Sequence, residues 1–80
     1  MTEAEVLEKL TGIFRDVFAN GALVARPDMT ANDVDGWDSL SHVDMMVLVE
    51  EEFGIRFSTR EVTGLKNVGD LVLLVLAKTR

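Results

Sequence analysis

The chain has 80 residues, which is enough for one domain that buries roughly 60% of the surface exposed by the unfolded chain. It contains no cysteine and a single histidine, so disulfides, thiolate metal sites and the usual clusters of metal ligands are excluded. Stability must therefore come from apolar packing, for which 48% hydrophobic residues supply the material. We expect a single domain over residues 1–80 without a metal site.

The beginning of the sequence is acidic, unlike the basic start and apolar block of a signal peptide. The longest apolar run, residues 71–77, is far too short to cross a bilayer. We therefore expect a soluble protein of the cytoplasm.

The first predicted helix begins at Thr2, which forms a capping box with Glu5 three residues later. Asn20-Gly21 predicts a left-handed stop at its end. Between these points apolar residues recur at helical spacing and form one stripe, made of Val6, Leu7, Leu10, Ile13, Phe14, Val17 and Phe18.

Residues 21–37 lack a sustained period and contain the only proline, Pro27. Connections of this length are uncommon in compact domains unless they are functional or carry structure of their own. We expect four apolar side chains to hold this loop to the bundle: Leu23, Val24, Met29 and Val34.

The second predicted helix begins at Asp38 or Ser39, with Asp38 as a favourable N-cap, and ends at Gly54. Its expected apolar face consists of Leu40, Val43, Val47 and the region of Phe53.

Two further helices follow. Ser58 and Glu61 form a second capping box, which predicts a short helix that ends near Gly64. Asn67 caps a last helix through the apolar run to residue 77, which we prefer to a strand because no partner strand is predicted. The expected fold is all-α, a bundle of three main helices and one short helix, with a long loop between the first two.

Negative charge is concentrated in the middle of the chain. Residues 28–52 contain eight carboxylates and no lysine or arginine, whereas the rest has eight basic and six acidic residues. Such a surface repels nucleic acid and anionic lipid and attracts basic protein surfaces. Charge alone fits a merely solvated acidic surface equally well.

The segment of residues 34–40 places the hydroxyl of Ser39 at the first turn of a helix, behind a loop that contains Gly36. A phosphate ester at this position would face free backbone N–H groups and the positive end of the helix dipole. The simpler alternative is that Asp38 and Ser39 are ordinary helix-start residues.

A longer sequence pattern favours the first of these two interpretations. Asp35-Gly36-Trp37-Asp38-Ser39-Leu40, an apolar helix and then Glu50-Glu51-Glu52-Phe53-Gly54 together resemble the acyl carrier protein family. The resemblance continues through the short third helix to the start of the last helix, and so covers nearly the whole chain in the right order and spacing. It is much more specific than an isolated Asp-Ser-Leu.

The resemblance implies that Ser39 receives 4′-phosphopantetheine from coenzyme A, and that Asp38 assists the transferase and its magnesium ion. The arm would carry acyl or aminoacyl groups as thioesters for a polyketide, mixed polyketide/peptide or fatty-acid pathway, without catalysis by this chain. The Gly-Trp-Asp-Ser-Leu form is more similar to discrete carriers of secondary metabolism than to the housekeeping fatty-acid carrier.

The resemblance also implies partners. These are a phosphopantetheinyl transferase and acyltransferase, ketosynthase or ligase enzymes with basic docking surfaces, with neither nucleic acid nor membrane, and the carrier is expected to be a monomer. The partner-facing side of the second helix would consist of Leu40, Asp44, Met46, Val47, Glu50 and Glu51. The alternative for Val47 and for one of the methionines is a place in the core.

His42 departs from many relatives and lies three residues from Ser39 and four from Asp38. A Ser-His-Asp hydrolase is one alternative, although about eighty residues leave little room for an oxyanion hole and a substrate cleft. We instead expect a solvent-facing side chain near the arm that tunes the choice of partner. The other alternative function is an unmodified acidic helical module that binds basic proteins.

Overall fold

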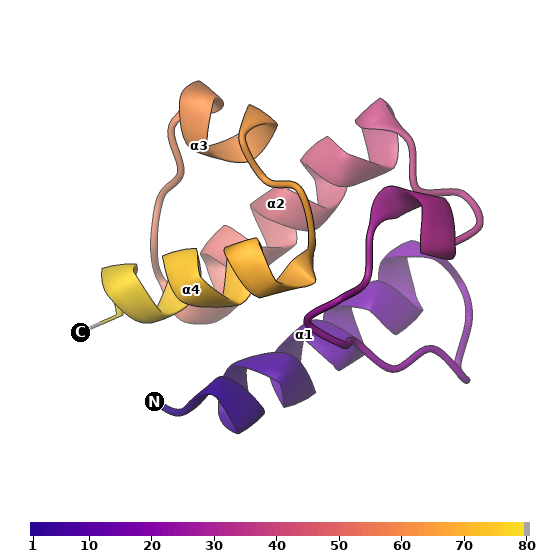
Figure 1. Ribbon diagram of the computed structural model, residues 1–80, viewed down its shortest axis with the longest axis horizontal. Coiled ribbons are helices and arrows are strands. Elements are labelled where there is room, and N and C mark those ends of the chain that lie inside the picture. Colours follow the sequence, from indigo (N-terminus) through magenta and orange to yellow (C-terminus); the bar gives the residue numbers. More distant parts are fainter. Residues whose placement is uncertain (80) are drawn as a thin grey trace.

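The computed structural model describes residues 1–79 as four α-helices and one 3₁₀ turn (Figure 1). The elements in chain order are α1 (Glu3–Val17), η1 (Ala31–Asp33), α2 (Ser39–Phe53), α3 (Thr59–Thr63) and α4 (Val68–Lys78). No strand occurs in these residues, so the predicted all-α bundle with one short helix is confirmed. None of the helices in the described part of the chain is long and apolar enough to cross a membrane.

The helix starts follow the predicted caps. At α1, Thr2 N donates to Glu5 Oε1 at 2.9 Å and Glu5 N donates to Thr2 Oγ1 at 3.2 Å, which completes the capping box. Ser58 and Glu61 form the same pair at α3, and the side chain of Asn67 accepts from Asp70 N at 2.8 Å at α4.

The end of α1 differs from the prediction. The left-handed residue is Ala19, with φ 50°, and Asn20 N donates to Arg15 O at 3.1 Å. Asn20 already belongs to the next turn, because its side chain accepts from Ala22 N at 3.0 Å and its carbonyl accepts from Leu23 N at 3.2 Å. Asn20-Gly21 therefore follows the stop rather than forming it. At the end of α2, by contrast, Gly54 takes the predicted left-handed conformation with φ 67°.

The core is one apolar cluster between α1, α2, α4 and the long first loop, and α1 packs against both α2 and α4. The side chains that are fully buried or nearly so include Val6, Leu10, Phe14, Met45, Val49, Leu71, Val72 and Val75. Most of the stripe predicted on α1 thus lies in the core.

The face that α2 turns inward is not the predicted one. Met45, Met46 and Val49 are buried, whereas Leu40, Val43 and Val47 are 73%, 53% and 46% exposed. The inward residues share helical spacing with half-buried Phe53. Because residues 45–49 are continuously apolar, the pattern alone could not decide which side of α2 meets α1 and α4.

The loop between α1 and α2 is held in place by buried side chains and by backbone hydrogen bonds. Ala25, Met29 and Val34 are buried, but Val24 is 50% exposed, so the prediction that Val24 anchors the loop is wrong. The carbonyls of Met29 and Pro27 accept from Val68 N at 2.9 Å and Gly69 N at 2.8 Å. These bonds satisfy N–H groups in the first turn of α4, which have no partner within the helix.

Candidate functional site

The start of α2 is built by reciprocal hydrogen bonds between Asp38 and Ser41. Asp38 Oδ1 accepts from Ser41 N at 2.9 Å, and Asp38 N donates to Ser41 Oγ at 2.9 Å. The Ser41 hydroxyl in turn donates to Gly36 O at 2.8 Å. Gly36 has φ 87°, a left-handed conformation that favours glycine, and it lets the loop turn into the helix.

The hydrogen bonds from the backbone and hydroxyl of Ser41 lower the pKa of the Asp38 carboxyl below its ordinary value. Asp38 is therefore ionised at neutral pH. It places a negative charge one residue before Ser39.

The two serines of this turn have different surroundings. Ser39 is the first residue of α2 and is exposed, whereas Ser41 is half-buried and its hydroxyl is used in the cap. Ser39 is thus the hydroxyl of this turn that is open to solvent, and it lies beside the N–H groups of the first helical turn.

Trp37 anchors the segment before Ser39 to α1. Its ring lies 5.5 Å from Phe14 and 5.7 Å from Phe18, measured between ring centroids. Such aromatic pairs add to the stability that burial of their area provides. In the sequence, Trp37 belongs to the Gly-Trp-Asp-Ser-Leu motif, and no packing role was predicted for it. The signal that could have located it is the pair of aromatic residues at the end of the α1 stripe.

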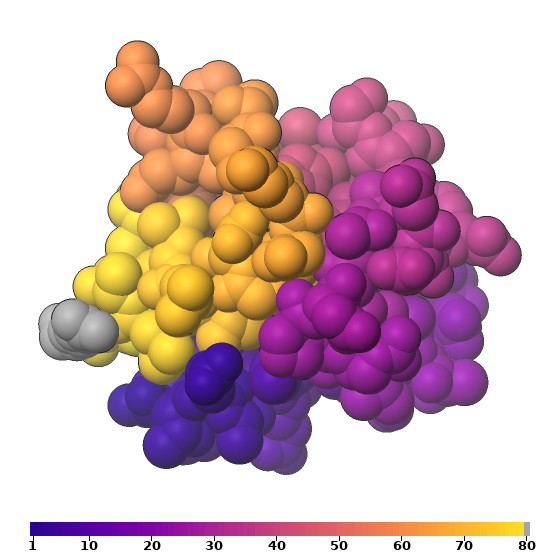
Figure 2. Space-filling view, viewed as in Figure 1, coloured from indigo at the N-terminus to yellow at the C-terminus, as the bar shows by residue number. Residues whose placement is uncertain are grey.

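A pocket of about 480 Å³ opens beside Ser39, between the start of α2 and the segment that contains α3 (Figure 2). Its apolar lining includes Val43, Met45, Val62, Leu65 and Leu71. Ser39 and Asp38 lie in its wall, and Lys66 is the cation among its lining residues. Sequence patterns did not predict this pocket, because its walls come from four separate segments.

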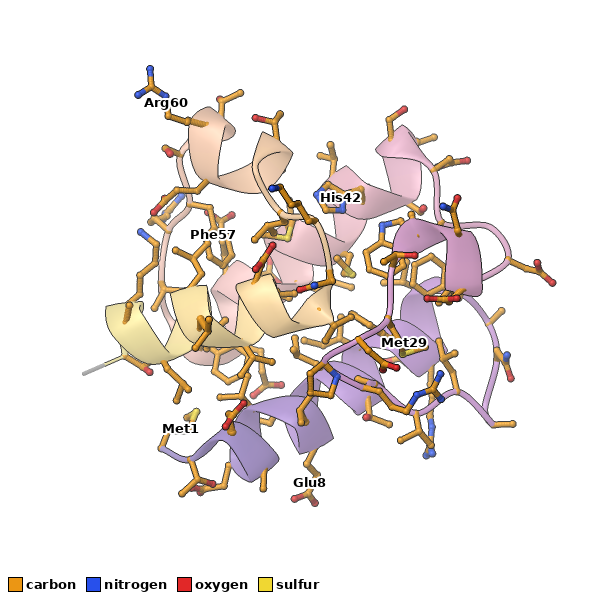
Figure 3. All side chains as sticks on the ribbon, in the orientation of Figure 1. Met1, Glu8, Met29, His42, Phe57 and Arg60 are labelled. Atoms are coloured by element: carbon orange, nitrogen blue, oxygen red, sulfur yellow. The ribbon has the colours of Figure 1, made fainter. Side chains whose placement is uncertain are left out.

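His42 does not face solvent, contrary to the prediction. It is half-buried on the side of α2 next to α3 and the loop that follows α3 (Figure 3). Its Nδ1 lies 3.1 Å from Trp37 Nε1 and its Nε2 lies 3.0 Å from Val62 O. Both ring nitrogens are therefore engaged by groups other than Ser39, and the arrangement needed for a Ser-His hydrolase is not formed.

Four of the six residues expected on the partner-facing side of α2 share one exposed face. Leu40, Asp44, Val47 and Glu51 are exposed and recur at helical spacing. Met46 is 3% exposed and belongs to the core, which corrects its expected place on this side. Glu50 is half-buried, and its Oε2 accepts from Phe57 N at 2.7 Å, so its carboxylate holds the chain after α2.

Comparison with known proteins identifies the class. Residues 8–75 match the family model described as a phosphopantetheine attachment site. The acyl carrier protein of Acidothermus cellulolyticus is 36% identical over 72 residues, which are 90% of this chain and 86% of that protein. Acyl carrier protein 2 of Ralstonia nicotianae is 31% identical over 90% of this chain and 89% of its own length.

A solved structure is similar as well. The solution structure of the holo acyl carrier protein from Geobacter metallireducens matches with a TM-score of 0.84 and 46% sequence identity. The match covers 91% of this chain and 84% of that one. This chain belongs to the acyl carrier protein family, whose members are carriers rather than enzymes and whose prosthetic group is 4′-phosphopantetheine.

The residues at the start of α2 fit this group. Its phosphate would be joined to an exposed hydroxyl at a helix start, and its elongated chain would find an apolar pocket beside that hydroxyl. Lys66 supplies a positive charge among residues of the same pocket.

Proposed function

We propose that this chain carries acyl groups on a 4′-phosphopantetheine arm attached to Ser39. The observation that supports this most strongly is the contrast between two serines two residues apart. Ser39 is exposed at the start of α2 beside a pocket, while Ser41 uses its hydroxyl to cap the same helix.

Asp38 is proposed to assist the modification. Its carboxylate is ionised at neutral pH and precedes Ser39, a position suited to interact with a magnesium ion held by the transferase. When bound, the arm supplies a terminal thiol that holds acyl or aminoacyl groups as thioesters. The contribution of this chain is to present the arm and to keep it within reach of partner enzymes, which raises the effective concentration of the tethered group.

We propose that partners dock on the exposed face of α2 made of Leu40, Asp44, Val47 and Glu51. These four residues combine apolar contact area with carboxylates. Basic surfaces on a phosphopantetheinyl transferase, an acyltransferase, a ketosynthase or a ligase would complement this charge. That the protein is a monomer and works in the cytoplasm are two further predictions.

The attachment site is tested by intact mass spectrometry. The purified protein is incubated with coenzyme A, magnesium and a promiscuous phosphopantetheinyl transferase. We expect a mass gain of one phosphopantetheinyl group in the wild type and in Ser41→Ala, and no gain in Ser39→Ala.

Other outcomes contradict the proposal in different ways. A mass gain that persists in Ser39→Ala would show that the group is attached to another residue. No gain with a transferase that modifies a known carrier in the same experiment rejects the proposal and favours an unmodified acidic module that binds basic proteins.

We further propose that the pathway belongs to secondary metabolism, on the basis of the Gly-Trp-Asp-Ser-Leu form at residues 36–40. The holo protein, loaded with a malonyl group, is offered to a housekeeping fatty-acid ketosynthase beside a known fatty-acid carrier. Elongation at a rate equal to that of the known carrier would contradict this assignment.

A further inference from the structure

His42 connects two segments that line the pocket, the one that contains Trp37 and the one that contains Val62. Its Nδ1 is 3.1 Å from Nε1 of Trp37, which precedes the attachment serine, and its Nε2 is 3.0 Å from the carbonyl of Val62 in α3. The imidazole also stacks on the indole, with ring centroids 6.1 Å apart and 20° between the planes. We call this pair of hydrogen bonds the His42 bridge.

The chemistry of the partners fixes the state of the imidazole. The indole Nε1–H of Trp37 can only donate, so His42 Nδ1 must carry no proton. The carbonyl of Val62 can only accept, so His42 Nε2 must carry one. The bridge therefore requires the neutral imidazole with its proton on Nε2, and neither the other neutral tautomer nor the protonated ring can form both bonds.

The helix at one end of the bridge depends on such contacts. α3 has five residues, none of them buried, and helices of this length are not stable alone. Val62 O lies in its last turn, where carbonyls have no partner within the helix. The other end of the bridge is firmly held, because Trp37 packs on Phe14 and Phe18 of α1.

We propose that His42 is a positioning residue that holds α3 against the start of α2 and thereby keeps the pocket beside Ser39 narrow. Protonation of His42 places a proton on Nδ1 and breaks the bond with Trp37, while Nε2 can still donate to Val62 O, so the bridge is cut at its Trp37 end. The consequence for a cargo on the arm rests on the proposed function, whereas the bridge itself is a property of the unmodified chain.

The acidic groups around His42 keep their charge between about pH 8 and pH 5. Asp38 on its own helix and Lys66 after α3 line the same pocket. On α3, Glu61 accepts from Ser58 N at 2.8 Å and lies 3.1 Å from Lys78 Nζ, which ties α3 to α4. The pKa values of Asp38 and Glu61 are lowered by their hydrogen bonds, so both stay ionised over this range.

The chain has one tryptophan and one histidine, so the indole and the imidazole of the bridge give unambiguous NMR signals. At pH 8 we expect the ¹⁵N shifts of the imidazole to identify an unprotonated Nδ1 and a protonated Nε2. As the ring becomes protonated, the indole N–H resonance of Trp37 and the amides of α3 are expected to shift together. The exchange of the Trp37 indole N–H with solvent, corrected for pH, should rise about tenfold, which is the effect of losing roughly one hydrogen bond.

Two variants separate the bridge from simple packing. His42→Gln keeps an acceptor for Trp37 and a donor for Val62 O and cannot be protonated, so it should retain protection of the indole N–H at all pH values from 8 to 5. His42→Phe keeps a ring of similar size without either bond, so it should lose this protection at every pH. Equal protection in the two variants would overturn the proposal, as would a wild-type Nδ1–H tautomer.

The effect on cargo is measured in the protein modified at Ser39 with an octanoyl-loaded arm. We expect the octanoyl group to perturb the amides of Val62 and Leu71 more strongly in His42→Phe than in His42→Gln. Equal perturbation would reject the role in cargo entry. If the arm cannot be attached, the proposed function fails, but the measurements on the unmodified chain still decide whether the bridge exists.

Discussion

Met46 and Val47 are adjacent apolar residues of α2 whose surroundings are opposite. Met46 is 3% exposed and contacts the core, whereas Val47 is 46% exposed on the face proposed to bind partners. Because the cost of truncating an apolar side chain depends on how deeply it is buried, the two residues give a direct test of the orientation of α2.

We expect Met46→Ala to lower the free energy of unfolding by about 2–5 kcal/mol, as other large-to-small substitutions in cores do. Val47→Ala should change it by less than about 1 kcal/mol. Urea denaturation followed by circular dichroism measures both. A larger loss for Val47→Ala would mean that α2 is rotated from the orientation described above.

Glu50 shows that a carboxylate within the acidic segment of residues 28–52 can have a structural role. Its Oε2 accepts from Phe57 N at 2.7 Å, and the Phe57 ring is partly buried against the core, with Lys78 Nζ 5.9 Å from its centroid (Figure 3). Removal of the acceptor would leave a half-buried backbone N–H without its partner.

We therefore expect Glu50→Ala to destabilise the fold by about 1–3 kcal/mol and Glu50→Gln, which keeps an acceptor oxygen, to remain near the wild type. Thermal unfolding at neutral pH checks this. If the two variants unfold alike, the bond to Phe57 does not contribute, and a docking role for Glu50 becomes the better explanation.

At the scale of the elements, three helix starts depend on ionised side chains. Hydrogen bonds with the backbone and side chains of Thr2, Ser41 and Ser58 lower the pKa values of Glu5, Asp38 and Glu61, respectively, and Lys78 adds to the effect at Glu61. A carboxylate whose pKa is lower in the folded state stabilises that state at pH values above its unfolded pKa. This contribution disappears as pH falls through the folded pKa.

The stability of the protein should accordingly fall as pH drops below about 4.5, where the unfolded chain takes up protons that these folded carboxyls resist. Chemical denaturation at a series of pH values between 6 and 3 measures the slope. In the triple variant Glu5→Gln, Asp38→Asn, Glu61→Gln, the slope should be clearly shallower. An unchanged slope would show that other carboxyls govern acid unfolding.

At the scale of the whole molecule, the C-terminal end of α2 lies beside α1, since Lys9 Nζ is 3.5 Å from Glu52 Oε2. Asp44 and Glu51 are exposed on α2, whereas Glu8 is exposed on α1 and points away from the bundle at the lower edge of the view (Figure 3). Charges that face a basic partner affect the encounter and are screened by salt, whereas distant charges contribute little.

Charge reversal tests whether this side is the docking surface. We expect Asp44→Lys and Glu51→Lys each to raise the KM for modification by a phosphopantetheinyl transferase by about fivefold at low salt, and the difference to shrink at high salt. Glu8→Lys makes the same change of charge and serves as the control. Equal effects of all three substitutions would indicate a response to net charge rather than a docking surface on α2.

Local signals in the sequence determined the helix starts and the position of the candidate serine. Thr2, Asp38, Ser58 and Asn67 cap the helices as predicted, because capping depends on hydrogen bonds within three or four residues along the chain. The motif around Ser39 is equally local. These features follow from the chain itself, and a single sequence is sufficient to find them.

Only the tertiary structure decided which side of α2 faces inward, that Met46 belongs to the core and that His42 is half-buried. The continuous apolar run of α2 offers two faces to the core, and contact with α1 and α4 selects one of them. That rotation carries His42 inward with Met45 and Val49, where it meets Trp37 and the carbonyl of Val62 from distant parts of the chain. Such contacts depend on packing between elements, which no pattern within one helix records.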